Sequence, residues 1–261
     1  MDAATKVRYS AARRIARDAG ALLLRHFGRL DSYEHKGAID LVSVADRESE
    51  ALVQSAILDA FPDDAIRAEE NGSHPGTSGF EWVVDPLDGT TNFVHGLSTF
   101  VVSIGVLRDG RRVIGVCFAP VLGELFAAAA GQGATLNGRP IYVSATASAD
   151  QALVLSGFPY DRRSRIDALL ERIKRVLMAT RGLRRMGAAA YDLCTIACGR
   201  ADFFFEQGLH AWDIAAGTLI VEEAGGRVTG YSGAPLDLDG ANILVSNGRL
   251  HDELGQIVGP V

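Results

Sequence analysis

Hydrophobic and polar residues follow two different periods along this chain, and the periods predict the order of its elements. Apolar positions recur at helical spacing over 3–27 and 45–60. Runs rich in β-branched and aromatic residues follow, with turn residues such as Asp109-Gly110 between them. We expect strands there near 80–84, 99–107, 112–119 and 124–130. Consecutive strands joined by short turns pair in opposite directions, so this stretch predicts an antiparallel sheet.

The sequence pattern changes after Ser144, where short apolar runs typical of strands alternate with stretches of helical spacing. Strands are expected at 152–156, near 183–186, at 203–205 and at 243–245, with helices at 166–178, 188–199 and 213–223. The predicted fold class is α+β or α/β, with an antiparallel sheet in the N-terminal half and a mixed α/β C-terminal half. We divide the chain into an N-terminal part, 1–144, and a C-terminal part, 145–261.

Composition and charge narrow the class of protein. The chain has 261 residues, 48% of them hydrophobic, and can bury a large core as one unit or as two closely packed halves. A net charge of −6 argues against a general nucleic-acid or anionic-membrane surface, because those surfaces need clustered basic residues. No run of about 18 apolar residues occurs, so no membrane span is expected. Cys117, Cys194 and Cys198 fit a reducing cytoplasm.

The strongest chemical signal is the segment 85–93, which reads DPLDGTTNF. Asp85 and Asp88, three apart in a turn, can bridge two hard divalent cations. The Gly-Thr-Thr that follows suits the start of a helix, where free backbone N–H groups receive phosphate. Turn dipeptides and a simple threonine cap are the alternative. The D-x-D-G-T loop of haloacid-dehalogenase phosphatases fits less well, because Pro86 replaces its nucleophile. A metal bridge with a water nucleophile is the better interpretation.

Two further segments carry acids of the same kind. Residues 65–72 read AIRAEENG, with the acidic pair Glu69 and Glu70, and residues 203–217 read FFFEQGLHAWDIAAG, in which Asp213 precedes small residues. Alone, Asp213 would be interpreted as a helix cap. Together with DPLDGTTNF, these segments resemble the inositol monophosphatase family. Its pattern is an acidic pair, D-P-[LI]-D-G-T-[TS]-N-F and W-D-x-A-[AG]-G.

The resemblance extends over nearly the whole chain, from about 14 to 247. Further family elements are D-x-V-T-x-x-D at 40–46, with Ser43 for the usual Thr, a hairpin at 131–138, SGFPY at 156–160 and R-x-x-G-[SA] at 184–188. The resemblance implies a layered α-β-α-β-α sandwich with the active site between its two sheets. It also implies a homodimer, with most metal ligands in the N-terminal half and the substrate pocket in the C-terminal half.

The cofactor implied by the resemblance is Mg²⁺, two to three ions held by oxygen ligands. The ligand set comprises Glu69, Asp85, the carbonyl of Leu87, Asp88 and Asp213. The first ion is expected on Glu69, Asp85 and the Leu87 carbonyl, and the second on Asp85, Asp88 and Asp213, so that Asp85 bridges the two ions. A weaker third ion is expected near Glu69, which is also counted among the catalytic residues. Glu70, beside a ligand, is expected to support the ligands rather than to bind an ion, and direct contact with the metal is the alternative.

The resemblance also assigns roles around the phosphate. Thr90, paired with Asp46, is expected to take a proton from the attacking water, and the N–H groups of Gly89 and Thr90 are expected to hold phosphate. For Asp46 the alternative is a helix cap. Lys36 is a further candidate, for which a solvated loop lysine is the alternative.

The substrate side of the pocket is assigned in the same way. Glu206 is expected to bind substrate hydroxyls, and the backbone at Gly187, Ala188 and Ala189 to line the same pocket. A surface glutamate at a strand end is the alternative for Glu206. His210 borders the pocket or is a packed or surface histidine. Arg184 and Arg185 reach an anionic substrate or stabilise the fold.

The function so predicted is Mg²⁺-dependent hydrolysis of a phosphomonoester, inositol 1-phosphate, by metal-activated water. The expected partner is thus a small phosphorylated polyol, and millimolar Li⁺ is expected to inhibit. Histidinol phosphate, fructose 1,6-bisphosphate and nucleotide 3′-phosphates remain open as substrates. An alternative of another class is a binding partner of the RNA-processing or transcription machinery.

Overall fold

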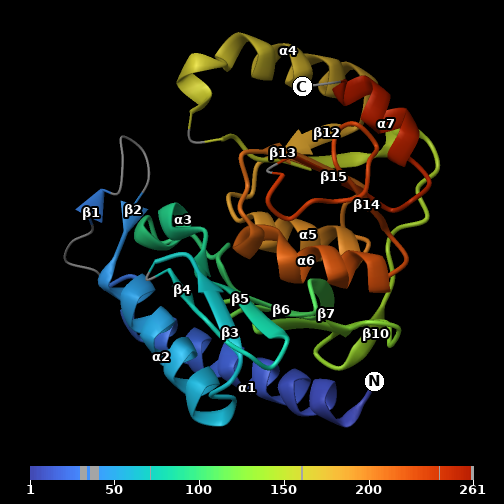
Figure 1. Ribbon diagram of the computed structural model, residues 1–261. Helices are drawn as coiled ribbons and strands as arrows, with labels where there is room; N and C mark the ends of the chain where they lie inside the picture. The colour runs from blue at the N-terminus through green and yellow to red at the C-terminus, as the bar shows by residue number, and fades with distance from the viewer. Residues whose placement is uncertain (30–33, 36–40, 71, 160, 241, 260–261) are drawn as a thin grey trace.

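Helices and sheets alternate in five layers in the computed structural model, which describes residues 1–29, 34–35, 41–70, 72–159, 161–240 and 242–259 (Figure 1). One pair of helices lies outside the first sheet, a second pair lies between the sheets and a third lies outside the second sheet. In that order the pairs are α1 (Ala3–His26) with α2 (Val44–Ala60), α5 (Ala189–Ala197) with α6 (Ala211–Glu223), and α4 (Ile166–Ala179) with α7 (His251–Val258). The predicted α-β-α-β-α sandwich is confirmed.

The first sheet has eight strands in the order β10-β9-β8-β7-β6-β5-β3-β4. Their bounds are β3 Ala65–Ala68, β4 Ser73–His74, β5 Phe80–Asp88, β6 Val101–Arg108, β7 Arg111–Ala119, β8 Glu124–Ala129, β9 Ala134–Leu136 and β10 Arg139–Ile141. Its pairings are antiparallel as predicted, except that β3 runs parallel to β5. The short strand β3 was not predicted, and its pairing makes the sheet mixed.

Strand β5 is the element of this sheet that positions acidic residues. It is buried along almost its whole length because helices cover both faces of the sheet. Its pairing with β6 shifts register between Asp85 and Asp88, the position of a β-bulge or similar irregularity. Bulges redirect side chains and are common beside active sites. The two aspartates therefore leave the end of β5 in directions that a regular strand would not give.

The second sheet has five strands in the order β12-β11-β13-β15-β14. Their bounds are β11 Leu153–Ser156, β12 Gly182–Arg184, β13 Phe203–Gln207, β14 Arg227–Thr229 and β15 Asn242–Ser246. Strand β11 is parallel to β12 and β13, and β15 is antiparallel to β13. The predicted mixed C-terminal half is confirmed, although β14 and helix α7 were not predicted. Each sheet is built from one half of the chain, while the division at 144 stays a prediction.

Smaller elements connect the layers. They are the antiparallel pair β1 (Glu34–His35) and β2 (Leu41–Val42), helix α3 (Thr90–Val94), and the 3-10 turns η1 (Ala149–Gln151) and η2 (Arg162–Ser164). Among the described residues no helix is long and apolar enough to cross a membrane.

Helix α6 lies unusually close to the first sheet. A Cβ added to Gly115 of β7 would lie 2.4 Å from the carbonyl oxygen of Ala216, and one added to Gly105 of β6 would lie 2.8 Å from the Cβ of Ala215. Only glycine at these two positions allows this approach. The contact brings the first turn of α6, which carries Asp213, close to the end of β5.

Candidate active site

A cavity of about 520 Å³ lies where the end of β5 meets the first turns of α5 and α6. Both halves of the chain contribute to its wall, so neither half contains the site alone. The lining includes Glu69, Asp85, Leu87, Asp88, Gly89 and Thr90 from the first half and Gly157, Arg185, Asp192, Glu206, His210 and Asp213 from the second.

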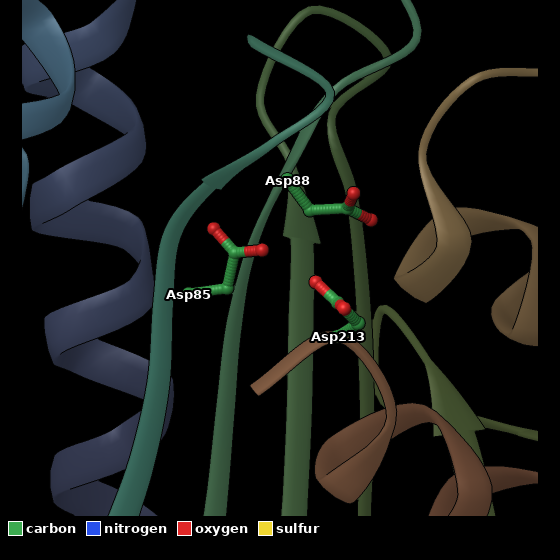
Figure 2. A group of neighbouring side chains, drawn as sticks. All are labelled: Asp85, Asp88 and Asp213. Atoms are coloured by element: carbon green, nitrogen blue, oxygen red, sulfur yellow. The ribbon is translucent and has the colours of Figure 1, made fainter. Parts of the chain in front are cut away.

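Three carboxylates converge in this cavity. Asp85, Asp88 and Asp213 each offer an oxygen, and the three oxygens lie within 4.8 Å of one another. Figure 2 shows the three side chains gathered around one space, two from β5 and one from α6. The predicted ligand group of the second ion is thus brought together from segments more than a hundred residues apart in the sequence.

Backbone N–H groups fix two of these carboxylates locally. The Leu87 N–H donates to Oδ1 of Asp85 at 2.9 Å, and the His210 N–H donates to Oδ2 of Asp213 at 2.7 Å. Asp213 therefore caps its own helix and also faces the carboxylate group. The two interpretations of this residue are compatible, because a carboxylate has two oxygens.

Asp88 is fixed by N–H groups from a distant part of the sequence. Its oxygens accept the N–H groups of Ala189 at 3.2 Å and Ala190 at 2.6 Å, which are in the first turn of α5. The N-cap residue of that helix, Ala188, makes no side-chain capping bond. Asp88 thus supplies the cap from the other half of the chain, and it holds Ala188 and Ala189 at the cavity wall.

The electrostatics of the group favour a bound cation. Burial raises the pKa of Asp85 and of Asp213 well above the usual range, and the neighbouring carboxylates raise both further. Burial also raises the pKa of Asp88 to about 6, against the lowering effect of its N–H donors. Divalent cations would remove this repulsion, and the all-oxygen donor set suits Mg²⁺. The residues therefore fit the predicted metal, although the identity of the ion stays a prediction.

Thr90 and Asp46 are in contact, as the predicted pair requires. The Thr90 hydroxyl lies 3.0 Å from Oδ1 of Asp46 and 3.1 Å from the Leu87 carbonyl. The other oxygen of Asp46 accepts the N–H and hydroxyl of Ser43 at 2.7 and 2.6 Å. Asp46 thus belongs to the capping box of α2 and also contacts Thr90. Its catalytic role stays a prediction.

The acidic pair after β3 divides between two environments. Glu69 lines the cavity, and its charge is among those that raise the pKa of Asp85. It does not belong to the group of three carboxylates above. Glu70 is not among the lining residues, and its N–H donates to Oε2 of Glu50 at 2.8 Å. This placement agrees with a position of Glu70 behind the ligands.

The turn expected to receive phosphate is compact. Gly89 has φ +93°, and a Cβ there would lie 3.0 Å from the Thr99 carbonyl oxygen and 3.1 Å from the Cβ of Ala188. Glycine therefore lets the turn pack against the start of α5. Helix α3 has only five residues, so its dipole is small. Phosphate binding here, which stays a prediction, would depend on the N–H groups of the first turn.

The same cavity also contains Glu206. This residue is in β13 and is only 8% exposed, so it is not a surface glutamate. Burial raises its pKa to about 8, with a smaller lowering by Arg185. A Cβ on Gly157 would lie 2.0 Å from a carboxylate oxygen of Glu206, so glycine leaves the room that this carboxylate occupies. Gly187 lines the same wall.

Several lining residues were not predicted from the sequence. Asp192 on α5 is 1% exposed, and its Oδ1 has no hydrogen-bond partner in the part of the chain that the structure describes. Burial raises its pKa well above the usual range, and Glu206 raises it further. The signal was an acid inside the apolar stretch of 189–197. Arg162 also lines the cavity, and no sequence pattern indicated it.

The remaining candidates differ in position. His210 lines the cavity, and its ring stacks on Trp212 with centroids 4.7 Å apart. Arg185 also lines it, whereas Arg184 is exposed and donates to the Leu183 carbonyl. Lys36 lies outside the described residues.

The chain is similar in sequence to a known family and to several named proteins. The model of a family described as the inositol monophosphatase family matches residues 5–259. An inositol-1-monophosphatase of Synechocystis is 46% identical over 240 residues, covering 91% of this chain and 84% of that protein. A Nus factor SuhB of Pseudomonas aeruginosa is 42% identical over 255 residues, covering 95% and 94%. A fructose-1,6-bisphosphatase/inositol-1-monophosphatase of Thermotoga maritima is 39% identical over 249 residues, covering 95% and 94%.

Solved structures are similar as well. An inositol monophosphatase from Anabaena superposes with a TM-score of 0.88 at 40% identity, covering 97% of this chain and 95% of that one. The extragenic suppressor protein SuhB from Bartonella henselae superposes with a TM-score of 0.92 at 36% identity, covering 95% and 97%.

Proposed function

Because the chain belongs to the inositol monophosphatase family, we propose that it is a Mg²⁺-dependent phosphatase that hydrolyses inositol 1-phosphate to inositol and phosphate. The observation that carries the proposal is that three carboxylates share one cavity with Thr90, whose hydroxyl contacts Asp46 behind the cavity wall. Neither feature alone would specify a phosphatase. Together they supply cation sites and a proton acceptor within reach of one phosphate ester.

The metal sites would use the oxygen donors of both halves. Glu69, Asp85 and the Leu87 carbonyl would hold one ion, and Asp85, Asp88 and Asp213 a second. Bound ions of this kind activate water and stabilise negative charge on phosphate oxygens. The raised pKa values of Asp85 and Asp213 support such sites, because a cation relieves the repulsion that burial creates. A third ion near Glu69 belongs to the same proposal.

Proton transfer would fall to Thr90 and Asp46. The Thr90 hydroxyl can direct its hydrogen to Oδ1 of Asp46, 3.0 Å away, which leaves its lone pairs to accept from a water. Asp46 is 1% exposed and is held by Ser43, so the acceptor stays in one orientation. The N–H groups of Gly89 and Thr90 would hold the phosphate oxygens.

Glu206 would select the polyol. It lies in the same cavity as the three carboxylates, and burial raises its pKa to about 8, which favours the protonated carboxyl group that can both donate and accept hydrogen bonds. A neutral polyol offers matching hydroxyls. Histidinol phosphate and nucleotide 3′-phosphates remain alternatives, as does fructose 1,6-bisphosphate. The Thermotoga relative and the cavity residues Arg162 and Arg185 favour that last alternative.

We also propose a cytoplasmic homodimer. Helix α4 exposes Ile166, Leu170 and Leu177 at helical spacing, and an uncovered apolar row of this kind supports contact with a second copy. The relative named as a Nus factor raises a second candidate role, as a partner of the transcription machinery. Catalysis and such a role are compatible, because surface contacts would leave the cavity intact.

A substrate panel tests the proposed function. Purified protein is incubated with inositol 1-phosphate, histidinol phosphate, fructose 1,6-bisphosphate, a nucleotide 3′-phosphate and 4-nitrophenyl phosphate, with Mg²⁺ or with a chelator, and released phosphate is measured. We expect the highest kcat/KM for inositol 1-phosphate and no turnover in chelator. Release from none of the substrates would contradict the proposal. A higher kcat/KM for another ester would support the phosphatase activity but contradict inositol 1-phosphate as the substrate.

A further inference from the structure

Helix α2 carries three buried polar side chains on one face, and each reaches a different segment of the cavity wall. Asp46, Ser49 and Glu50 have the relative positions i, i+3 and i+4, which place them side by side on a helix. They are 1%, 0% and 0% exposed, although serine and the two acids are rarely buried so fully. The function proposed above uses Asp46 and leaves the other two without a role.

We propose that Ser49 and Glu50 are positioning residues that set the geometry of the metal site. The inference rests on the proposed phosphatase function. Neither residue lines the cavity. Each acts through the backbone of a segment that carries a ligand: Ser49 through the segment after Asp85, and Glu50 through the segment after Glu69.

Ser49 is connected to Asp85 by a single peptide group. Its hydroxyl donates to the Pro86 carbonyl at 3.0 Å. The N–H of the same peptide, that of Leu87, donates to Oδ1 of Asp85 at 2.9 Å. A hydrogen bond to the carbonyl of an amide polarises the group and strengthens the bond made by its N–H. Ser49 therefore helps to orient the carboxylate that is expected to bridge both ions.

Glu50 holds the other ligand segment. Its Oε2 accepts the N–H of Glu70 at 2.8 Å, and its Oε1 accepts the side-chain amide of Gln54 at 3.1 Å. A bond from a backbone N–H to a charged carboxylate is stronger than one between neutral groups. The contact is made on the residue that directly follows Glu69, so it limits where the Glu69 side chain can point.

Packing alone does not account for these two residues. Helix α2 is already anchored to the sheet by Val53 and Ile57, both 0% exposed. Burying a carboxylate has a high desolvation cost, and an apolar side chain in such a place is often neutral or stabilising. The cost is explained if the polar contacts hold the ligand segments in place.

Two variants with matched controls test the inference. Ser49→Ala and Glu50→Gln are compared with Ser55→Ala and Glu48→Gln, which make the same chemical changes at exposed positions of the same helix. Mg²⁺ binding to each metal-free, full-length protein is measured by calorimetry, beside the Mg²⁺ concentration for half-maximal activity and the Tm. Loss of a residue that orients metal ligands typically weakens binding about 10- to 100-fold. We expect that loss in Ser49→Ala and Glu50→Gln and wild-type binding in both controls.

The outcomes separate this inference from the proposed function. If the wild-type protein binds no Mg²⁺ and releases no phosphate, the proposed function itself fails. If the wild type binds Mg²⁺ and the two variants bind it equally well, the positioning role is wrong, even when their Tm falls. If Glu50→Gln does not fold, Ser49→Ala decides the result, because it removes a single hydroxyl.

Discussion

Two groups of carboxylates in the cavity are held in different ways: Asp85, Asp88 and Asp213, which we call the metal end, and Glu206 with Asp192, which we call the substrate end. At the metal end, Asp85, Asp88 and Asp213 all accept backbone N–H groups, which fix their orientation before any ligand binds. At the substrate end, Glu206 and Asp192 are also buried. Among the residues that the structure describes, no backbone N–H donates to either carboxyl group. The metal end therefore has carboxylate oxygens fixed by backbone N–H groups, and the substrate end has carboxyl groups without such donors.

The difference suggests a division of work within one pocket. Fixed oxygens suit a reaction that is the same for every phosphate ester, because the reacting atoms do not vary. Carboxyl groups without protein donors can instead form hydrogen bonds with the hydroxyls of a substrate. They suit selection among alcohols, because a substrate without matching hydroxyls leaves the carboxyl groups unpaired. We therefore expect changes at the metal end to affect all substrates alike and changes at Glu206 to affect them differently.

The largest effect is expected for Asp85→Asn. Loss of the bridging carboxylate weakens both proposed ion sites, so activity should fall by about 10⁴-fold or more for every ester, as when a member of a catalytic unit is removed. Released phosphate at saturating Mg²⁺ measures it. Asp59→Asn, at an exposed position of α2, is the control. Wild-type turnover in Asp85→Asn would contradict a catalytic role for the carboxylates of the metal end.

Thr90→Ala should lower kcat by roughly 10²–10⁴, the range of general acid–base catalysis, with Mg²⁺ affinity nearly unchanged. The reason is that the hydroxyl contacts Asp46 rather than supplying a carboxylate ligand. Thr90→Ser keeps the hydroxyl and should keep most of the activity. Steady-state kinetics separate the cases, and a change in KM alone would assign Thr90 to phosphate binding.

Glu206→Ala should act on one substrate only. We expect KM for inositol 1-phosphate to rise roughly 10- to 100-fold, the value of one or two hydrogen bonds, while 4-nitrophenyl phosphate is hydrolysed as before. Glu206→Gln can still donate a hydrogen bond, so its loss should be smaller. Equal losses on both esters would mean that Glu206 supports the fold rather than the selection.

The pH dependence of stability should also distinguish the ends. A carboxyl with a raised pKa keeps its proton in the folded protein after the unfolded chain has lost it. Its stabilisation is therefore full below the unfolded pKa and is lost as the pH rises toward the folded value. For Glu206 this window runs from 4.5 to about 8.

The free energy of unfolding of the metal-free protein should fall across this window by a few kcal/mol, at roughly 1.4 kcal/mol per pKa unit. Mg²⁺ binds the ionised carboxylates of the metal end and should remove their share of the slope but not that of Glu206. Glu206→Gln should remove the remainder. Urea unfolding at pH 5, 6.5 and 8 checks this, and a slope unaffected by the substitution would contradict the raised pKa.

The smallest expected effect is inhibition by millimolar Li⁺. This ion resembles Mg²⁺ in size and has half its charge, so it can occupy the site of Asp85, Asp88 and Asp213 without supporting catalysis. Inhibition should be strongest at saturating substrate and weaker in Asp213→Asn. Rates in a Li⁺ titration are compared with K⁺ at equal ionic strength, and identical responses to both salts would exclude occupancy of this site.

The sequence indicated the metal end better than the substrate end, for a physical reason. Asp85 and Asp213 each accept an N–H from a residue no more than three positions away in the sequence. A local motif therefore contains both the carboxylate and its donor. Arg162 and Asp192 reach the cavity only through the packing of separate elements, which no short pattern records. Asp192 could have been found as an acid in an apolar helix.

Short or isolated sequence patterns were also missed in the fold and in helix α2. Long periodic helices were predicted, whereas β3 and β14, four and three residues long, gave too short a pattern. Ser49 and Glu50 were missed although their spacing from Asp46 places them on its face of the helix. Attention to that face, rather than to Asp46 alone, would have found them.

The most direct test of the division of work is the ratio of kcat/KM for inositol 1-phosphate to that for 4-nitrophenyl phosphate, measured in the wild type, Thr90→Ala and Glu206→Ala. Thr90→Ala should lower both values and leave the ratio unchanged. Glu206→Ala should lower the ratio roughly 10- to 100-fold with little effect on the aryl ester. A ratio that changes equally in both variants would contradict separate roles for the metal end and the substrate end.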